Sequence, residues 1–146
     1  MRKLIFLCSI LFFSSCSGEK ARSGGIIFED PVAYHDFIVD QQNVIMHHMV
    51  ILTESYDQGD EEMIQASYLN LVNACDSCAL LIEELTPYEH DSSLQKASNE
   101  LFKFYTRVFH HEYKEMLDIF LKGSMASDAD IASLNRIVEE IRQEEE

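Results

Sequence analysis

The sequence between residues 30 and 60 reads DPVAYHDFIVDQQNVIMHHMVILTESYDQGD and has the signals of a helix start and a helix end. Asp30 followed by Pro31 is typical of a helix start, because aspartate caps free backbone N–H groups and proline suits the first turn. Gly59 suits the left-handed residue that ends many helices. The stretch therefore predicts a helix over residues 31–57 with a second helix directly after it.

The second helix has its own start and stop signals. Asp60 is a capping residue, and Glu61 and Glu62 place negative charge in the first turn, where the helix dipole favours it. Thr86 precedes Pro87, and a residue before proline is pushed out of the helical conformation. We expect this helix to end there.

Two further helices are predicted after Pro87. Ser92 and Gln95 match a capping box that opens a third helix, which Gly123 closes. Ser127 and Asp130 repeat the opening pattern, and the fourth helix frays within residues 144–146. These boundaries leave three connections of about three to six residues, which favour antiparallel neighbours.

The expected fold is all-α, an up-down-up-down antiparallel four-helix bundle over residues 30–146. No alternating strand pattern competes with it. At about 100° per residue, each helix has one apolar face. The positions predicted to face inward are, helix by helix, Tyr34, Phe37, Ile38, Gln41, Val44, Ile45, His48, Ile51 and Leu52; Ile64, Tyr68, Leu71, Val72, Cys75, Cys78, Ala79, Ile82 and Leu85; Leu94, Ala97, Leu101, Tyr105, Val108, Phe109, Glu112, Met116 and Ile119; and Ile131, Leu134, Val138 and Ile141.

The first 16 residues have the features of an export signal. Arg2 and Lys3 precede an apolar run, Leu4 to Phe13, of about ten residues, which is too short to span a membrane as a helix. Two serines and Cys16 follow, and this arrangement resembles the signal peptide of bacterial lipoproteins. Ordinary signal-peptidase cleavage, which releases a soluble secreted protein, is the alternative.

The resemblance implies a domain organisation and a location. Residues 1–15 are the signal peptide, and Cys16 becomes the acylated first residue of the mature chain. Residues 16–29, rich in glycine and serine, form the lipidated N-terminus and a flexible linker. The protein is then expected in the bacterial cell envelope, held to a membrane through Cys16 with its domain outside the cytoplasm.

The net charge restricts the partners. The chain has 26 acidic and 11 basic residues, a charge of −15, which becomes −17 when Arg2 and Lys3 leave with the signal peptide. Such a protein has no electrostatic attraction for nucleic acid or for anionic lipid. We therefore expect no nucleic-acid partner, membrane attachment through the N-terminal lipid, and an envelope protein as the class of partner.

Three polar residues lie at the centres of predicted apolar faces. Gln41 and His48 do so in the first helix, and Glu112 in the third. A buried carboxylate or imidazole needs a partner. We expect an internal network in which His48 pairs with Glu112 and with a hydroxyl from Tyr68 or Tyr105. A ligand or metal site built from the same groups is one alternative, and a helix phase wrong by one residue is the other.

Cys75 and Cys78 form a C-x-x-C pattern inside the second helix. Thioredoxin-like chemistry needs this pair at a helix N-terminus, and haem attachment needs histidine where Ala79 stands. Buried structural thiols, a strained disulfide, and a metal or redox site remain open. Together with Met116, the two thiolates have the soft-ligand character that Cu(I) prefers.

No enzyme motif is present. The chain contains no Glu-x-x-His pair of the di-iron type, no phosphate-binding glycine loop and no G-x-S-x-G or H-E-x-x-H pattern. Adjacent residues in His47-His48 and His110-His111 diverge on a helix and cannot chelate together. We expect a non-enzymatic interaction or structural module without a cofactor. The alternative is a metal-binding or redox bundle that uses Cys75, Cys78, His48 and Glu112.

Overall fold

The computed structural model describes residues 25–144, so the predicted signal peptide, Cys16 and the first part of the linker lie outside the described residues. The described part consists of α1 (Pro31–Gln58), α2 (Glu61–Glu83), α3 (Ser93–His110), α4 (Glu112–Leu121), the short 3-10 helix η1 (Gly123–Met125) and α5 (Asp128–Glu144). It contains helices and no extended strand over these residues, which confirms the predicted all-α class.

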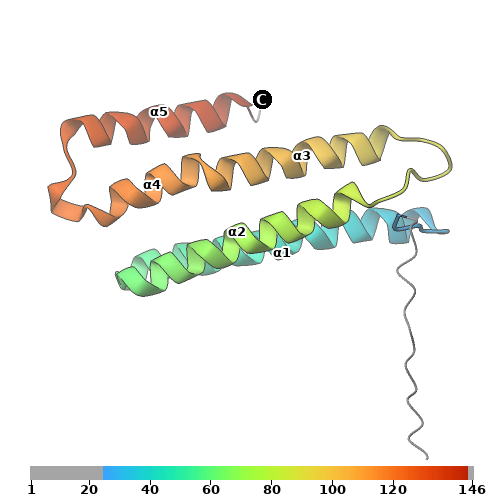
Figure 1. The fold of residues 1–146 in the computed structure, drawn as a ribbon, viewed down its shortest axis with the longest axis horizontal. Coiled ribbons are helices and arrows are strands. Elements are labelled where there is room, and N and C mark those ends of the chain that lie inside the picture. The colour runs from blue at the N-terminus through green and yellow to red at the C-terminus, as the bar shows by residue number, and fades with distance from the viewer. Residues whose placement is uncertain (1–24, 145–146) are drawn as a thin grey trace, which may run out of the picture.

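The helices lie along a common long axis: α2 packs on α1, α3 packs on α2, α4 continues from α3 after a break, and α5 packs on α4 (Figure 1). α1 and α2 form a close pair, α3 and α4 together lie along α2, and α5 lies along α4. Within this part of the chain, α5 does not pack along α1. None of the helices over residues 25–144 combines the length and the apolar character needed to cross a membrane.

The caps of the first two helices match the sequence signals. The Asp30 carboxylate accepts the Ala33 N–H at 3.2 Å, and the Asp60 carboxylate accepts the Met63 N–H at 2.9 Å. Gly59 ends α1 with a φ of 70° in the left-handed region, where glycine has no steric penalty. The predictions of the start of both helices and of the turn between them are confirmed.

The two predicted capping boxes have different outcomes. In the first turn of α5, the Asp130 N–H donates to Ser127 Oγ at 3.2 Å and the Ser127 N–H donates back to Asp130 at 2.8 Å, so this box is confirmed. At α3 the prediction is wrong, because the Ser92 side chain makes no capping bond. The Asp91 carboxylate accepts the Ser93 N–H at 2.8 Å in its place.

The end of the predicted linker belongs to the folded domain. The Ile26 N–H donates to Glu84 O at 2.7 Å, and the Thr86 N–H donates to Ile26 O at 2.8 Å. A side chain at Gly25 would place its Cβ only 2.3 Å from Glu84 O. We call residues 25–29 the N-terminal strap, because they tie the start of the domain to the end of α2. The predicted flexible linker therefore does not extend as far as residue 29.

Aromatic rings reinforce the strap. The Phe28 ring lies 5.9 Å from the Tyr34 ring and 5.2 Å from the Phe37 ring of α1. The Tyr88 hydroxyl, from the loop that follows α2, donates to Glu29 O at 3.4 Å. The chain therefore enters the domain at the end where α1 begins and α2 ends.

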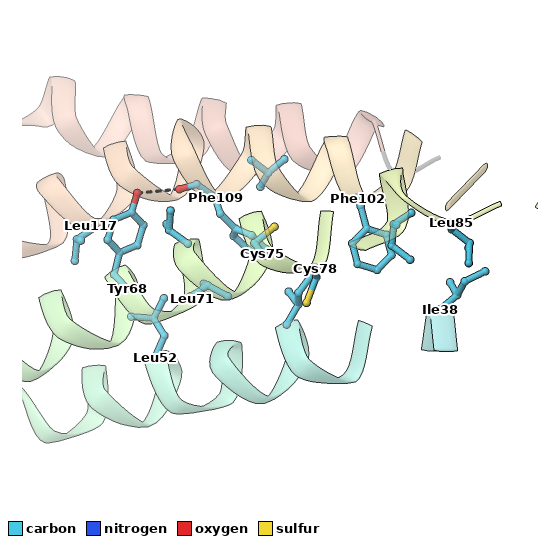
Figure 2. Packing of buried hydrophobic residues seen from close by; sticks show 14 of the residues in the cluster. Ile38, Leu52, Tyr68, Leu71, Cys75, Cys78, Leu85, Phe102, Phe109 and Leu117 are labelled. Atoms are coloured by element: carbon cyan, nitrogen blue, oxygen red, sulfur yellow. Dashed lines mark hydrogen bonds between the residues drawn. The ribbon is translucent and has the colours of Figure 1, made fainter. Parts of the chain in front are cut away.

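The predicted third helix is two helices. α3 ends at His110 and α4 begins at Glu112, with His111 between them at φ −113° and ψ −70°. The buried Tyr68 hydroxyl donates to Phe109 O at 2.9 Å just before the break (Figure 2). A side chain that takes a carbonyl of the helical hydrogen-bond ladder is a known cause of helix bending. No local signal in the sequence marks this contact.

The core lies between α1, α2 and α3–α4 and includes Leu52, Leu71, Cys75, Phe102 and Leu117 (Figure 2). Two predicted faces are shifted. In α3 the buried residues of the first turns are Ser98 and Phe102, and Leu94 and Ala97 are exposed. In α5 Ile137 is buried, whereas Ile131 and Val138 are 52% and 54% exposed. α5 buries only one edge of its apolar face, because it packs mainly on α4.

We predict that Tyr68→Phe lowers the free energy of unfolding by about 1–2 kcal/mol, because a buried carbonyl loses its donor. Tyr34→Phe is the matched control. Tyr34 is also buried, and its hydroxyl makes no hydrogen bond among the described residues, so its removal should be neutral or stabilising. Denaturant unfolding of both variants is the measurement. Equal effects would show that the Tyr68 hydroxyl contributes nothing specific.

Candidate functional site

Glu112 does not pair with His48. Its Oε1 accepts a hydrogen bond from Arg107 Nη1, and its side chain is 16% exposed. Its Oε2 is buried without a hydrogen-bond partner among the described residues. The Arg107 guanidinium also lies over the Phe104 ring, 5.4 Å from its centroid. The predicted His48–Glu112 pair is therefore wrong, and the partner of Glu112 is Arg107.

The break in the predicted third helix explains this difference. Residues five apart are not neighbours on a regular helix, where contacts run between positions three or four apart. Arg107 lies in α3 and Glu112 opens α4, so the break at His111 lies between them. Sequence reasoning missed Arg107 because it assumed one continuous helix.

The other members of the predicted network lie apart from Glu112. Gln41 bonds within its own helix, donating to Phe37 O at 3.4 Å. His48 is half-buried in α1, and its ring is 5.7 Å from the His47 ring. Tyr105 is half-buried and stacks on Phe109 with a centroid distance of 6.2 Å. The structure brings none of these three residues into a shared hydrogen-bonded cluster with Glu112.

Cys75 and Cys78 are free thiols in the core. Figure 2 shows Cys75 on the side of α2 that faces α3, and Cys78 lower, on the side of α1. Cys75 Sγ is 3.6 Å from Thr106 Oγ1 of α3. The structure thus has the two thiols reduced, in different packing environments.

Burial sets the chemistry of both thiols. It raises the pKa of Cys75 to about 11, although the hydrogen bond between Cys75 and Thr106 lowers it, and the neighbouring Asp76 carboxylate raises it further. Burial also raises the pKa of Cys78. Thiolate is the reactive and metal-binding form of cysteine, so both shifts oppose redox and metal chemistry at neutral pH.

The described residues do not form a cluster of metal ligands. Over residues 25–144, no three His, Cys, Asp or Glu side chains gather in an arrangement that could hold a metal ion. Cys75 and Cys78 lie in the core, and Glu112 is bonded to Arg107. The set Cys75, Cys78, His48 and Glu112, expected for a metal-binding bundle, is therefore not assembled.

The polar surface between α3–α4 and α5 is occupied by ion pairs. It forms an open hollow of about 420 Å³ that includes His110, Glu115, Arg136 and Glu140. Arg136 bonds to Glu140 at 2.8 Å and to Glu115 at 3.3 Å, and these partners raise its pKa. His110 Nε2 lies 2.9 Å from the Asp76 carboxylate of α2. The Arg136–Glu115 pair links α5 to α4, the His110–Asp76 pair links α3 to α2, and the Arg136–Glu140 pair lies within α5.

The Arg107–Glu112 pair should be energetically coupled. In a double-mutant cycle of Arg107→Gln and Glu112→Gln, followed by denaturant unfolding, we expect a coupling of about 1–2 kcal/mol, because each substitution strands a partly buried group. His48→Leu combined with Glu112→Gln is the control and should be additive within about 0.5 kcal/mol. Coupling in the second cycle alone would restore the sequence-based pairing.

Stability should fall with rising pH because of Cys75. Above about pH 9 the unfolded chain releases the thiol proton, whereas the folded chain retains it until about pH 11. The free energy of unfolding is therefore unaffected by this thiol below about pH 9 and decreases as the pH rises from 9 toward 11. Cys75→Ala should flatten this loss in denaturant melts at several pH values, and thiol reagents should modify Cys75 only after unfolding. Rapid modification of the native protein would contradict the prediction.

In comparisons with protein-family models, with curated proteins and with solved structures, the chain matches none of them.

Proposed function

We propose that this chain is a membrane-anchored lipoprotein of the bacterial cell envelope, acylated at Cys16, whose domain acts as a non-enzymatic interaction or structural module. The observation that carries the proposal is the N-terminal pattern of Arg2-Lys3, a short apolar run and Ser14-Ser15-Cys16. This pattern lies outside the described residues and resembles a lipoprotein signal peptide.

The N-terminal strap supports a tethered domain. The described chain begins at Gly25, nine positions after Cys16, and is hydrogen-bonded to the end of α2 from Ile26 onward. Nine extended residues reach at most about 30 Å. A lipid on Cys16 would therefore hold the domain close to the bilayer by the end at which α1 starts.

The helix order supports an up-down-up-down antiparallel bundle as the arrangement of this domain. The chain turns at Gly59, again in the loop after α2, and a third time at η1, and the helix after each turn packs on the one before the turn (Figure 1). α1 is about 42 Å long at 1.5 Å per residue. The turns at Gly59 and η1 would then lie at the end far from the anchor, available to other envelope proteins.

The two buried thiols and the paired carboxylate of Glu112 support a role without catalysis. A catalytic cysteine needs a lowered pKa, and burial raises that of both Cys75 and Cys78. The carboxylate of Glu112 is bonded to Arg107. The large acidic surplus gives the surface a negative field, which favours partners with basic surfaces over nucleic acid or anionic lipid.

Cys16→Ser should abolish both acylation and membrane attachment, because the acidic body has no electrostatic route to the membrane. Metabolic labelling with radioactive palmitate, followed by detergent-phase partitioning, measures the two effects. Cys8→Ser is the matched control, since Cys8 lies in the predicted signal peptide, and it should keep the label. A Cys16→Ser protein that still partitions with membranes would place the anchor elsewhere.

A further inference from the structure

The domain has an apolar cleft on the side where α1 and α5 do not pack together. The cleft has a volume of about 200 Å³ and is bordered by α1, α3, α4 and α5. Ile141, in the C-terminal part of α5, closes one side of it. We call this hollow the α1–α5 cleft.

One wall of the cleft is a continuous row of aromatic rings from α3 and α4. Phe104 and Tyr105 have their centroids 6.0 Å apart, Tyr105 stacks on Phe109 at 6.2 Å, and Phe109 meets Tyr113 edge-on at 5.0 Å. The row crosses the break at His111, so α4 extends the wall that α3 begins. Ring faces and edges arranged in this way favour a flat aromatic molecule beside them.

The facing wall comes from α1 and consists largely of flexible side chains. Met46 and Met49 contribute thioethers, and Gln42 contributes an amide. Met46 is 56% exposed and lies at the mouth, whereas Met49 is half-buried and packs on the core. Methionine side chains adapt to irregular shapes and make favourable sulfur–aromatic contacts. A flat molecule could therefore lie between the thioethers and the aromatic wall.

The lining carries no charge. A quarter of the whole chain is charged, yet every side chain that borders the cleft is neutral, with the Gln42 amide and two tyrosines as its polar groups. A charged ligand would lose its hydration there without gaining an ion pair. The lining therefore selects for an uncharged molecule.

The volume of the cleft restricts the ligand to a small molecule. An apolar cavity of about 150 Å³ is enough to bind benzene in another protein, so a cleft of about 200 Å³ has room for one or two fused rings. It is far too small for a helix of a partner protein. We propose that the α1–α5 cleft binds a small, flat, uncharged aromatic molecule of one or two rings. This inference does not depend on the lipid anchor.

The test uses the full chain in detergent, with the methyl groups of its six methionines isotopically labelled for NMR, and indole as the probe. A ring bound in the cleft shifts the methyl signals of Met46 and Met49 through its ring current. Met63 and Met125 are exposed residues outside the cleft and serve as internal controls. We expect saturable shifts at Met46 and Met49 and none of comparable size at the controls.

Paired variants locate the site. Met46→Glu puts a carboxylate at the mouth and should weaken indole binding about tenfold, read from the Met49 signal. Val50→Glu makes the same change on the same helix at a position 52% exposed and outside the cleft, and should leave binding unchanged. Met116 of α4 is half-buried and outside the cleft, so an unchanged Met116 methyl signal shows that each variant remains folded.

A charged analogue completes the experiment. Indole-3-acetate has the same rings with a carboxylate and should bind at least about tenfold more weakly than indole. Shifts that do not saturate, shifts of equal size at all the methionines, or equal effects of Met46→Glu and Val50→Glu would each overturn the proposal. So would the absence of any shift at Met46 and Met49.

Discussion

The hydrogen bond from the Tyr68 hydroxyl to the Phe109 carbonyl oxygen links the two halves of the molecule. It joins the N-terminal half of α2 to the last turn of α3, and the helix breaks two residues after Phe109, at His111. Everything after that point, the position of α4 and the path of α5 along it, follows from the direction in which α4 leaves the break. The Arg107–Glu112 pair spans the same break. A single buried hydroxyl therefore connects the packing of α2 with the arrangement of the helices that follow the break, α4 and α5.

Features that depend on a few neighbouring residues could be predicted from the sequence. The cap at Asp30, the left-handed Gly59 and the Ser127–Asp130 box each require only a side chain and the backbone within three residues of it. The box expected at Ser92 fails because Asp91 is one residue closer to the turn after α2 and accepts the Ser93 N–H first. Choosing between two adjacent capping residues depends on that turn, which the local pattern does not specify.

Features that depend on contacts between helices could not be predicted. The apolar pattern correctly predicts that Glu112 is largely buried. It predicts the wrong partner, because the break at His111 has no local signal in the sequence. The sequence pattern predicts that the whole apolar face of α5 is buried. Ile137 is buried and Val138 is not, because α5 packs mainly on α4 and the position of that helix decides which edge of the face is covered. Amphipathic periodicity gives the width of a face but not the direction of its neighbour.

The N-terminal strap and the α1–α5 cleft lie at different positions along the axis of α1, and this separation affects which ligands can reach the cleft. The strap ties the chain to the end at which α1 begins, whereas Gln42 is the first residue of α1 in the cleft, about 17 Å further along the helix. If the anchor holds the strap end toward the bilayer, the mouth at Met46 stands in water above the lipid headgroups. A ligand would then arrive from the aqueous side, which requires a molecule soluble enough to diffuse and apolar enough to gain by leaving water. Small uncharged aromatic molecules meet both conditions. A long acyl chain is too large for the cleft and too insoluble to diffuse through water.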